Sequence, residues 1–244
     1  MPPLVSVVMP VFNGLRAGPG YLNQSIDSLV RQDYEGPLEI VIIDDGSTDG
    51  TGDVIRETAE RIKKTHLSRR IELITRPHAG VTKSLNAGAR HATGELVARQ
   101  DADDYSEPER ITRQVAYLTD HAEVAVVGSA VRVIHGSRRK DEVWYRSATD
   151  RLRIEDFRKQ CPLAHGSTMI RADVLKQVGY YNESYPHSQD YDLFWRIVRR
   201  WEIATIPDPL YCYRVHGNRV TTQKFRLQLD CANRIRQRIN REFR

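Results

Sequence analysis

The first part of the chain alternates between short, β-branched apolar runs and longer stretches in which apolar residues recur at helical spacing. This alternation constrains the fold more than any other feature, because strand–turn–helix units in series build a parallel sheet covered by helices. The predicted strands are 4–9, 38–43, 71–75 and 96–98, and the predicted helices are 21–33, 51–65 and a segment carrying Val81, Leu85 and Ala89. We therefore expect an α/β fold with a mainly parallel central sheet and helices on both faces.

The pattern beyond about residue 124 is less regular and contains no linker, so both halves are expected to share one sheet. The expected elements are strands over 124–134, 167–170 and 210–213, a basic turn at 137–140, and helices over 150–159, 172–178 and 190–201. From Gln223 onward, apolar residues three and four positions apart predict an amphipathic helix with an arginine-rich outer face. The predicted organisation is one domain over 1–222, with halves at 1–104 and 105–222, followed by a helix over 223–244.

Composition excludes several classes of protein. The chain has 244 residues, 40% hydrophobic and 28% charged, as expected of a globular protein with one large core. No apolar run approaches the ~20 residues of a membrane span, and the N-terminus lacks a secretory signal pattern, which predicts a cytoplasmic protein. Three cysteines without a Cys-x-x-Cys pair argue against a zinc site or redox dithiol. A net charge of +5 permits an anionic partner and identifies none.

Polar residues cluster directly after three of the predicted strands. The clusters are Asn13-Gly14, the segment 44–50 and the segment 101–104. In open α/β sheets, ligands bind outside the carboxyl ends of the strands. The sequence contains no Gly-x-Gly-x-x-Gly fingerprint, Walker loop or Ser/His/Asp order, which disfavours dinucleotide binding, P-loop phosphoryl transfer and acyl transfer.

Three carboxylates crowd the segment after the fourth strand. Asp101, Asp103 and Asp104 repel one another unless cations or hydrogen bonds compensate. A divalent ion such as Mg²⁺ or Mn²⁺, with phosphate oxygens completing its shell, would compensate them. The alternative is a solvated acidic turn that caps a helix near Glu107.

The other candidate residues each have a functional and a structural interpretation. An acid in 44–50 could accept hydrogen bonds from a nucleobase or ribose, or the segment could simply cap the next helix. Phe12 could stack on a base or belong to the core. Asp190 could be a general base or the N-cap of its helix. His216 could bind a metal beside a carboxylate or be structural.

Seven segments, in this order, resemble the motifs of the family 2 glycosyltransferases, which are inverting enzymes with the Rossmann-like GT-A fold. The segments are 5–13, 43–51, 80–88, 101–104, 165–171, 189–195 and 213–216. They resemble most the small bacterial members that build surface polysaccharide. The resemblance implies a nucleotide-sugar site and implies no nucleic-acid partner.

The resemblance also implies roles for individual residues. Phe12 would stack on the base, Asp45 would hydrogen-bond it, and Asp101 would reach the ribose. The remaining positions implied for the nucleotide-sugar pocket are Pro10, Asn13, Lys83, Asn86 and Ala102.

The implied metal is Mn²⁺ or Mg²⁺, held by Asp103 with His216 as a further ligand. Asp190 would be the catalytic base, although Gln189 stands where the family usually has Glu. An insertion over 16–20 lengthens the first loop relative to the family.

The implied reaction moves one sugar from a nucleotide-diphosphate sugar, UDP-linked by family habit, to a hydroxyl of a glycan or lipid-linked acceptor. The chain lacks the membrane helices and the Gln-x-x-Arg-Trp motif of processive synthases, which predicts one sugar per binding event. Side chains that could contact the acceptor, or could equally be packing residues, are His165, His187, Tyr185 and Trp195.

Two other functions compete with the transferase. A nucleotidyltransferase would need a glycine-rich basic loop after the first strand, where this chain has only Arg16. A non-catalytic nucleotide-sugar or glycan-binding module would have lost the base or metal carboxylates. The sequence leaves open whether the C-terminal helix docks on the inner face of the plasma membrane, on a partner or on the core, and whether the protein forms an oligomer.

Overall fold

The computed structural model describes residues 1–18, 20–66, 68–136, 138–144, 150–219 and 223–243. The strands are β1 (Val5–Val11), β2 (Leu38–Asp44), β3 (Arg69–Thr75), β4 (Leu96–Arg99), β5 (Tyr105–Ser106), β6 (Val124–His135), β7 (Arg138–Trp144), β8 (Arg151–Leu152), β9 (Met169–Arg171) and β10 (Glu202–Val215). The helices are α1 (Tyr21–Val30), α2 (Thr51–Thr65), α3 (Val81–His91), α4 (Arg110–Asp120), α5 (Ala172–Gln177), α6 (Gln189–Val198) and α8 (Phe225–Glu242). Short 3₁₀ helices are η1 (Gly14–Arg16), η2 (Ile154–Arg158) and η3 (His165–Ser167).

One sheet runs through both halves of the chain, in the order β3-β2-β1-β4-β9-β6-β10-β5, with β7 beside β6 and β8 beside β10. The strands β3, β2, β1 and β4 are all parallel, which confirms the α/β expectation for the first half. The second half is mixed, because β9 runs antiparallel to both β4 and β6 while β10 runs parallel to β6. The sheet is therefore parallel over the part of the sequence in which predicted strands and helices alternate regularly, and it is mixed over the rest.

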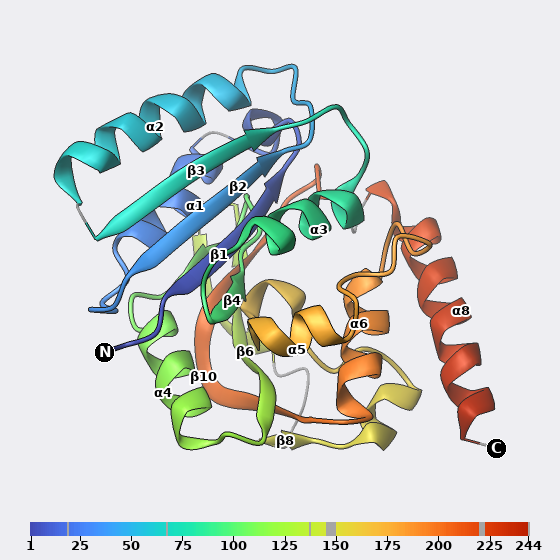
Figure 1. Cartoon of the computed structure of the whole chain (residues 1–244). Coiled ribbons are helices and arrows are strands. Elements are labelled where there is room, and N and C mark those ends of the chain that lie inside the picture. The colour runs from blue at the N-terminus through green and yellow to red at the C-terminus, as the bar shows by residue number, and fades with distance from the viewer. Residues whose placement is uncertain (19, 67, 137, 145–149, 220–222, 244) are drawn as a thin grey trace.

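The register of the parallel strands brings the polar clusters to one edge. Val11 at the end of β1 pairs with Asp44 at the end of β2, and Val8 pairs with Arg99 at the end of β4. The segments that follow these strands thus emerge side by side, as Figure 1 shows.

Helices cover both faces of the sheet, and each face has its own core. Along β1, Val7 and Met9 belong to one cluster with residues of α1, α2 and α4, whereas Val8 belongs to the other. This alternation follows from the two-residue period of a strand. The second cluster contains residues of α3, α5, α6 and α8, and in Figure 1 α3, α5 and α6 lie in front of the sheet.

The second half departs from the sequence prediction in several places. The helix expected over 150–159 is wrong, because Arg151 and Leu152 pair with β10 and only the 3₁₀ turn η2 follows them. The basic turn expected at 137–140 is also wrong at 138–140, which belong to β7, and Ser137 lies outside the described residues.

The strand expected over 210–213 is part of the longer β10. Its pairing with β6 shifts register between Ile206 and Pro209, so prolines interrupt the pattern without ending the strand. The sequence indicates α4 only as a helix near Glu107, without bounds, and its apolar face packs in the first core.

The C-terminal helix shares the core of the domain. Cys231, Ile235 and Ile239, spaced one turn apart, are buried in the second cluster. The part of α8 from Cys231 to Ile239 therefore packs on the core, and the boundary predicted at residue 223 stays a prediction. Within the described parts of the chain, every helix is too short or too polar to cross a membrane.

Candidate active site

A cavity of about 570 Å³ lies beyond the carboxyl end of β4. Its lining includes Arg99 and Asp101 from the end of β4, Asp190 from the first turn of α6, and Tyr211 from β10. Residues of α8 form another part of its wall. The fold thus brings Asp101 and Asp190, which are far apart in sequence, to one cavity.

Protein partners separate the three carboxylates of the acidic segment. Asp101 accepts a hydrogen bond from the Arg99 guanidinium at 2.6 Å. Asp104 is buried and accepts hydrogen bonds from the Tyr211 hydroxyl at 2.8 Å and the Arg214 backbone N–H at 2.7 Å. Burial, with Asp103 and Asp101 close by, raises the pKa of Asp104 well above its ordinary value. The solvated-turn alternative therefore does not describe this segment.

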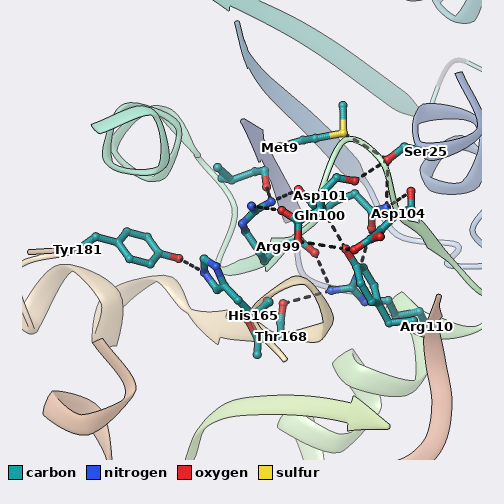
Figure 2. Close-up of polar contacts among 12 residues, drawn as sticks. Met9, Ser25, Arg99, Gln100, Asp101, Asp104, Arg110, His165, Thr168 and Tyr181 are labelled. Carbon is teal, nitrogen blue, oxygen red and sulfur yellow. Dashed lines mark hydrogen bonds and ion pairs between the residues drawn. The ribbon is translucent and has the colours of Figure 1, made fainter. Parts of the chain in front are cut away.

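A buried arginine, Arg110, forms hydrogen bonds with the residues that lead into the acidic segment. Arg110 is fully buried on α4 and donates to the side chain of Gln100 at 3.1 Å and to the backbone carbonyls of Arg99 at 2.8 Å and Thr168 at 3.2 Å, as Figure 2 shows. Burial lowers its pKa to about 10. Sequence reasoning missed both Arg99 and Arg110, because an arginine beside a core strand is identified as structural only once its partners are known.

Arg214 fixes the same segment from the side of β10. Its side chain is buried, donates to the Asp103 carbonyl at 2.7 Å and lies 4.0 Å from the centre of the Tyr21 ring. The acidic segment is thus held by both β4 and β10.

Asp103 and His216 form the candidate metal site. The Asp103 carboxylate lies 2.8 Å from Nε2 of His216, whose side chain is 9% exposed and whose Nδ1 is buried with no hydrogen-bond partner among the described residues. An oxygen and a nitrogen donor suit Mn²⁺ or Mg²⁺. The described residues contain no group of three ligands, so further ligands would have to come from phosphate or water. Neither Asp103 nor His216 is among the residues that line the cavity, although Asp101, two residues before Asp103, is.

Asp45, directly after β2, is surrounded by donors from the segment between β3 and α3 and from the first turn of α3. Its carboxylate accepts hydrogen bonds from the backbone of Ala79 at 3.1 Å and Gly80 at 2.8 Å and from the Ser84 hydroxyl at 2.7 Å, and it lies 2.7 Å from Nδ1 of His78. Asp45 therefore anchors the loop that leads into α3.

His78 connects this loop to the candidate base-stacking ring. Phe12 is 48% exposed and stacks on His78 with ring centroids 4.1 Å apart. Sequence reasoning missed His78, which has no signal in the pattern of its neighbours. Asn13, with a left-handed φ of 49°, accepts a hydrogen bond from the backbone of Thr48 at 2.9 Å and so joins the ends of β1 and β2.

The other residues implied for the nucleotide-sugar pocket have different surroundings. Asn86 is 1% exposed, and its side-chain amide forms hydrogen bonds with the backbone of Tyr181 and with the Glu183 carboxylate, the latter at 2.8 Å. Asn86 therefore joins α3 to the loop that contains Tyr181 and Glu183, called the 180s loop below. Ala102 packs against the first core cluster, and Pro10 pairs with Ile43 inside the sheet. Lys83 is exposed, and its carbonyl accepts a hydrogen bond from Arg76.

Asp190 is the second residue of α6, and the N-cap is Ser188. The alternative in which Asp190 caps its own helix is therefore wrong. A carboxylate in the first turn is still stabilised by the helix dipole.

The four residues considered for acceptor contact divide into two pairs. His165 and His187 line the cavity, whereas Tyr185 and Trp195 are buried in the second core cluster. Nε2 of His165 lies 2.9 Å from the Tyr181 hydroxyl. Burial lowers the pKa of His165 well below its ordinary value, and the nearby Arg99 charge lowers it further.

Comparison with solved structures defines the class of fold. The mannosyltransferase PcManGT from Pyrobaculum calidifontis, in complex with GDP-Man and Mn²⁺, superposes with a TM-score of 0.69 at 22% identity, over 93% of this chain and 61% of that one. TarS residues 1–349 of S. aureus, in complex with UDP-GlcNAc, gives a TM-score of 0.69 at 20% identity, over 88% of this chain and 59% of that one. The chain therefore has the GT-A glycosyltransferase fold and spans less than two thirds of these two solved chains.

Comparison of sequences defines the family. Residues 6–179 match the family model "Glycosyl transferase family 2". The O-antigen biosynthesis glycosyltransferase WbnJ of Escherichia coli is 31% identical over 94% of this chain and 86% of its own length. The chain belongs to glycosyl transferase family 2.

Proposed function

We propose that this chain transfers a single hexosyl or N-acetylhexosaminyl unit from a nucleotide-diphosphate sugar to a hydroxyl of a glycan or lipid-linked acceptor, with inversion and with a divalent metal. The observation that carries the proposal is that Asp101 and Asp190 line one cavity, and that Asp103, two residues beyond Asp101, pairs with His216. The similarity to WbnJ, an O-antigen biosynthesis glycosyltransferase, supports a reaction in the cytoplasmic assembly of surface polysaccharide.

Asp190 is the general base of the proposed reaction. Its carboxylate accepts the proton of the acceptor hydroxyl as that oxygen attacks the anomeric carbon. No second carboxylate is required as a nucleophile, so a single displacement inverts the anomeric configuration. Asp190 lies in the first turn of α6, at the positive end of the helix dipole.

The donor diphosphate and its metal belong at the margin of the cavity. Asp103 and His216 would hold Mn²⁺ or Mg²⁺ there, and a bound metal supplies Lewis-acid stabilisation of the departing diphosphate. The Mn²⁺ of the PcManGT complex supports this assignment. The arginines Arg99 and Arg214 keep the acidic segment in place whether or not a metal is bound.

The nucleobase is assigned to the exposed face of Phe12. Asp45 is assigned to positioning, because its carboxylate is already surrounded by donors from the 78–84 segment and fixes His78 against Phe12. UDP is the proposed nucleotide, supported by the UDP-GlcNAc complex of TarS, and GDP is the second nucleotide to test.

Thermal-shift screening of UDP- and GDP-sugars with and without Mn²⁺ tests the proposal, followed by analysis of the products. Binding raises the unfolding temperature by mass action. A transferase slowly hydrolyses its cognate donor to the nucleoside diphosphate. Release of pyrophosphate from a sugar phosphate and a nucleoside triphosphate would instead indicate a nucleotidyltransferase, and binding without turnover on any acceptor would indicate a binding module.

A further inference from the structure

The first two turns of α8 are apolar and exposed. Phe225, Leu227 and Leu229 are 59%, 52% and 46% exposed, whereas one turn further on Cys231 is 6% exposed. The second half of the helix is therefore anchored in the core, and the first half stands out from it. Monomeric proteins rarely leave large apolar side chains grouped in this way without a partner.

This exposed segment borders the candidate active site. Phe225 and Leu229 line the same cavity as Asp190, and so does Trp144 at the end of β7, which is 37% exposed. Because these side chains are both exposed and part of the lining, they form the rim of the cavity. We refer to Trp144, Phe225 and Leu229, together with the neighbouring Leu227, which is exposed but does not line the cavity, as the α8 rim.

Cations flank the α8 rim. Lys224 and Arg226 alternate with its apolar residues and are exposed, and Lys159 and Arg236 line the cavity beside it. Arg236 donates to the Lys159 carbonyl at 3.4 Å, which ties α8 to the segment after η2. Asp230 is the only acidic residue in 223–236. The rim therefore combines apolar side chains with a positive charge.

We propose that the α8 rim docks on an anionic lipid surface, so that the cavity with Asp190 opens toward an acceptor carried in that membrane. Aromatic and aliphatic side chains enter the boundary between headgroups and acyl chains, and lysine and arginine meet anionic headgroups. A second copy of the chain is a poorer occupant, since a symmetric interface through this patch would bring Lys224 and Arg226 of both copies together. The docking itself does not depend on the proposed transferase activity. Only the statement that the cavity opens toward an acceptor rests on the proposed function.

Vesicle flotation of the full chain tests the docking. We expect the protein to float with vesicles of phosphatidylcholine and phosphatidylglycerol, to stay behind with phosphatidylcholine alone, and to be released by salt. The double variant Phe225→Ser, Leu227→Ser should lower the partition coefficient at least about tenfold, because two apolar side chains leave the membrane. The double variant Lys224→Gln, Arg226→Gln should bind anionic vesicles more weakly, and added salt should change its binding less than that of the parent.

The matched control is Arg241→Gln, an exposed arginine in the last turn of the same helix, which should float like the parent. Circular dichroism and the unfolding temperature establish that each variant is folded. Absence of flotation with anionic vesicles, or flotation that the rim variants leave unchanged, overturns the proposal. A dimer in light scattering that the rim variants dissociate would also overturn it, in favour of a second copy.

The nucleotide thermal shift without vesicles separates this inference from the proposed function. If the shift persists while flotation fails, the docking alone is wrong. If flotation occurs as described but no nucleotide sugar binds, the docking stands and the proposed transferase activity is wrong.

Discussion

Arg238 on α8 lies 2.7 Å from Asp192 on α6, and Asp192 is completely buried. Asp192 also pairs with Arg196 at 2.8 Å, so its carboxylate sits between two guanidinium groups. Asp192 is two residues beyond Asp190 in the first turn of the same helix. The ion pair between Arg238 and Asp192 thus joins α8 to α6, the helix that carries the candidate base Asp190.

Replacing Arg238 by Ala should destabilise the fold. Asp192 would keep only Arg196, and a buried carboxylate that loses a partner is costly. Because Arg238 is 34% exposed and Arg196 remains, we expect a loss of about 1–3 kcal/mol in the free energy of unfolding, measured by urea denaturation. Arg241→Ala on the same helix is the control and should change stability by less than about 0.5 kcal/mol. Equal effects of the two variants would contradict the importance of the Arg238–Asp192 pair.

Asp190→Asn should lower turnover while leaving donor binding intact. An amide cannot accept the hydroxyl proton, and general-base catalysis contributes about 10²–10⁴-fold. The measurement is sugar transfer at saturating donor, together with the donor dissociation constant. Asp173→Asn, which alters an exposed acid in the first turn of α5, is the control. Near-normal turnover in Asp190→Asn would rule out its role as the base.

Removing the metal, or either of its proposed ligands, should abolish or weaken nucleotide binding. The stability of the fold should change less. We expect the thermal shift caused by UDP with Mn²⁺ to disappear with EDTA and in Asp103→Asn. In His216→Ala we expect the apparent affinity for UDP, taken from the thermal shift, to fall at least about tenfold. The exposed Asp53→Asn is the control. A nucleotide shift that is unchanged by EDTA and by both ligand variants would exclude the proposed site.

His165 should make stability depend on pH. Its pKa is lowered in the folded state, so below the unfolded value of about 6.5 the unfolded chain binds a proton that the folded chain does not. Stability contributed by neutral His165 is therefore present at higher pH and is lost as pH falls through about 6.5, by at most about 1.4 kcal/mol per pH unit. His187, whose pKa is lowered by burial and by Lys224, contributes with the same sign.

The variant His165→Gln isolates the contribution of His165. Urea denaturation between about pH 5 and 7.5 should show a shallower slope in the variant than in the parent. Parallel slopes would mean that His165 titrates normally in the folded protein.

Gly166→Ala should disturb the acidic segment through Tyr211. A methyl group at position 166 would come within 2.2 Å of the Tyr211 hydroxyl, which accepts the Asp101 backbone N–H at 3.1 Å and donates to Asp104. We expect a loss of about 1–3 kcal/mol in stability with weaker nucleotide binding. Gly217→Ala, where an added methyl meets nothing within 4 Å, is the control and should be nearly neutral. A fully stable Gly166→Ala with normal binding would show that Tyr211 can move freely.

The regular part of the fold was predictable because local sequence determines it. Strands β1, β2 and β4 are predominantly apolar, and clusters of polar residues follow them where the chain must turn. The acidic segment could be recognised for the same reason. Asp190 could be named because a resemblance covering its whole motif supplied a role that spacing alone does not.

The rest could not be predicted because it depends on partners distant in sequence. Arg99, Arg110 and Tyr211 acquire their roles from contacts with the acidic segment that only the folded sheet brings about. Asn86 carries a polar side chain typical of a binding residue, yet its hydrogen bonds are directed into the 180s loop.

The clamping of the acidic segment by β10 has a consequence for biosynthesis. Tyr211 and Arg214, which hold Asp104 and Asp103, belong to the last strand of the chain. While the ribosome is still translating the middle of the message, the nascent polypeptide already contains every aspartate of that turn but lacks the strand that shapes it. A truncated product ending near residue 200 would therefore lack the contacts that shape this turn, and the proposed nucleotide site would form only once β10 has emerged from the exit tunnel.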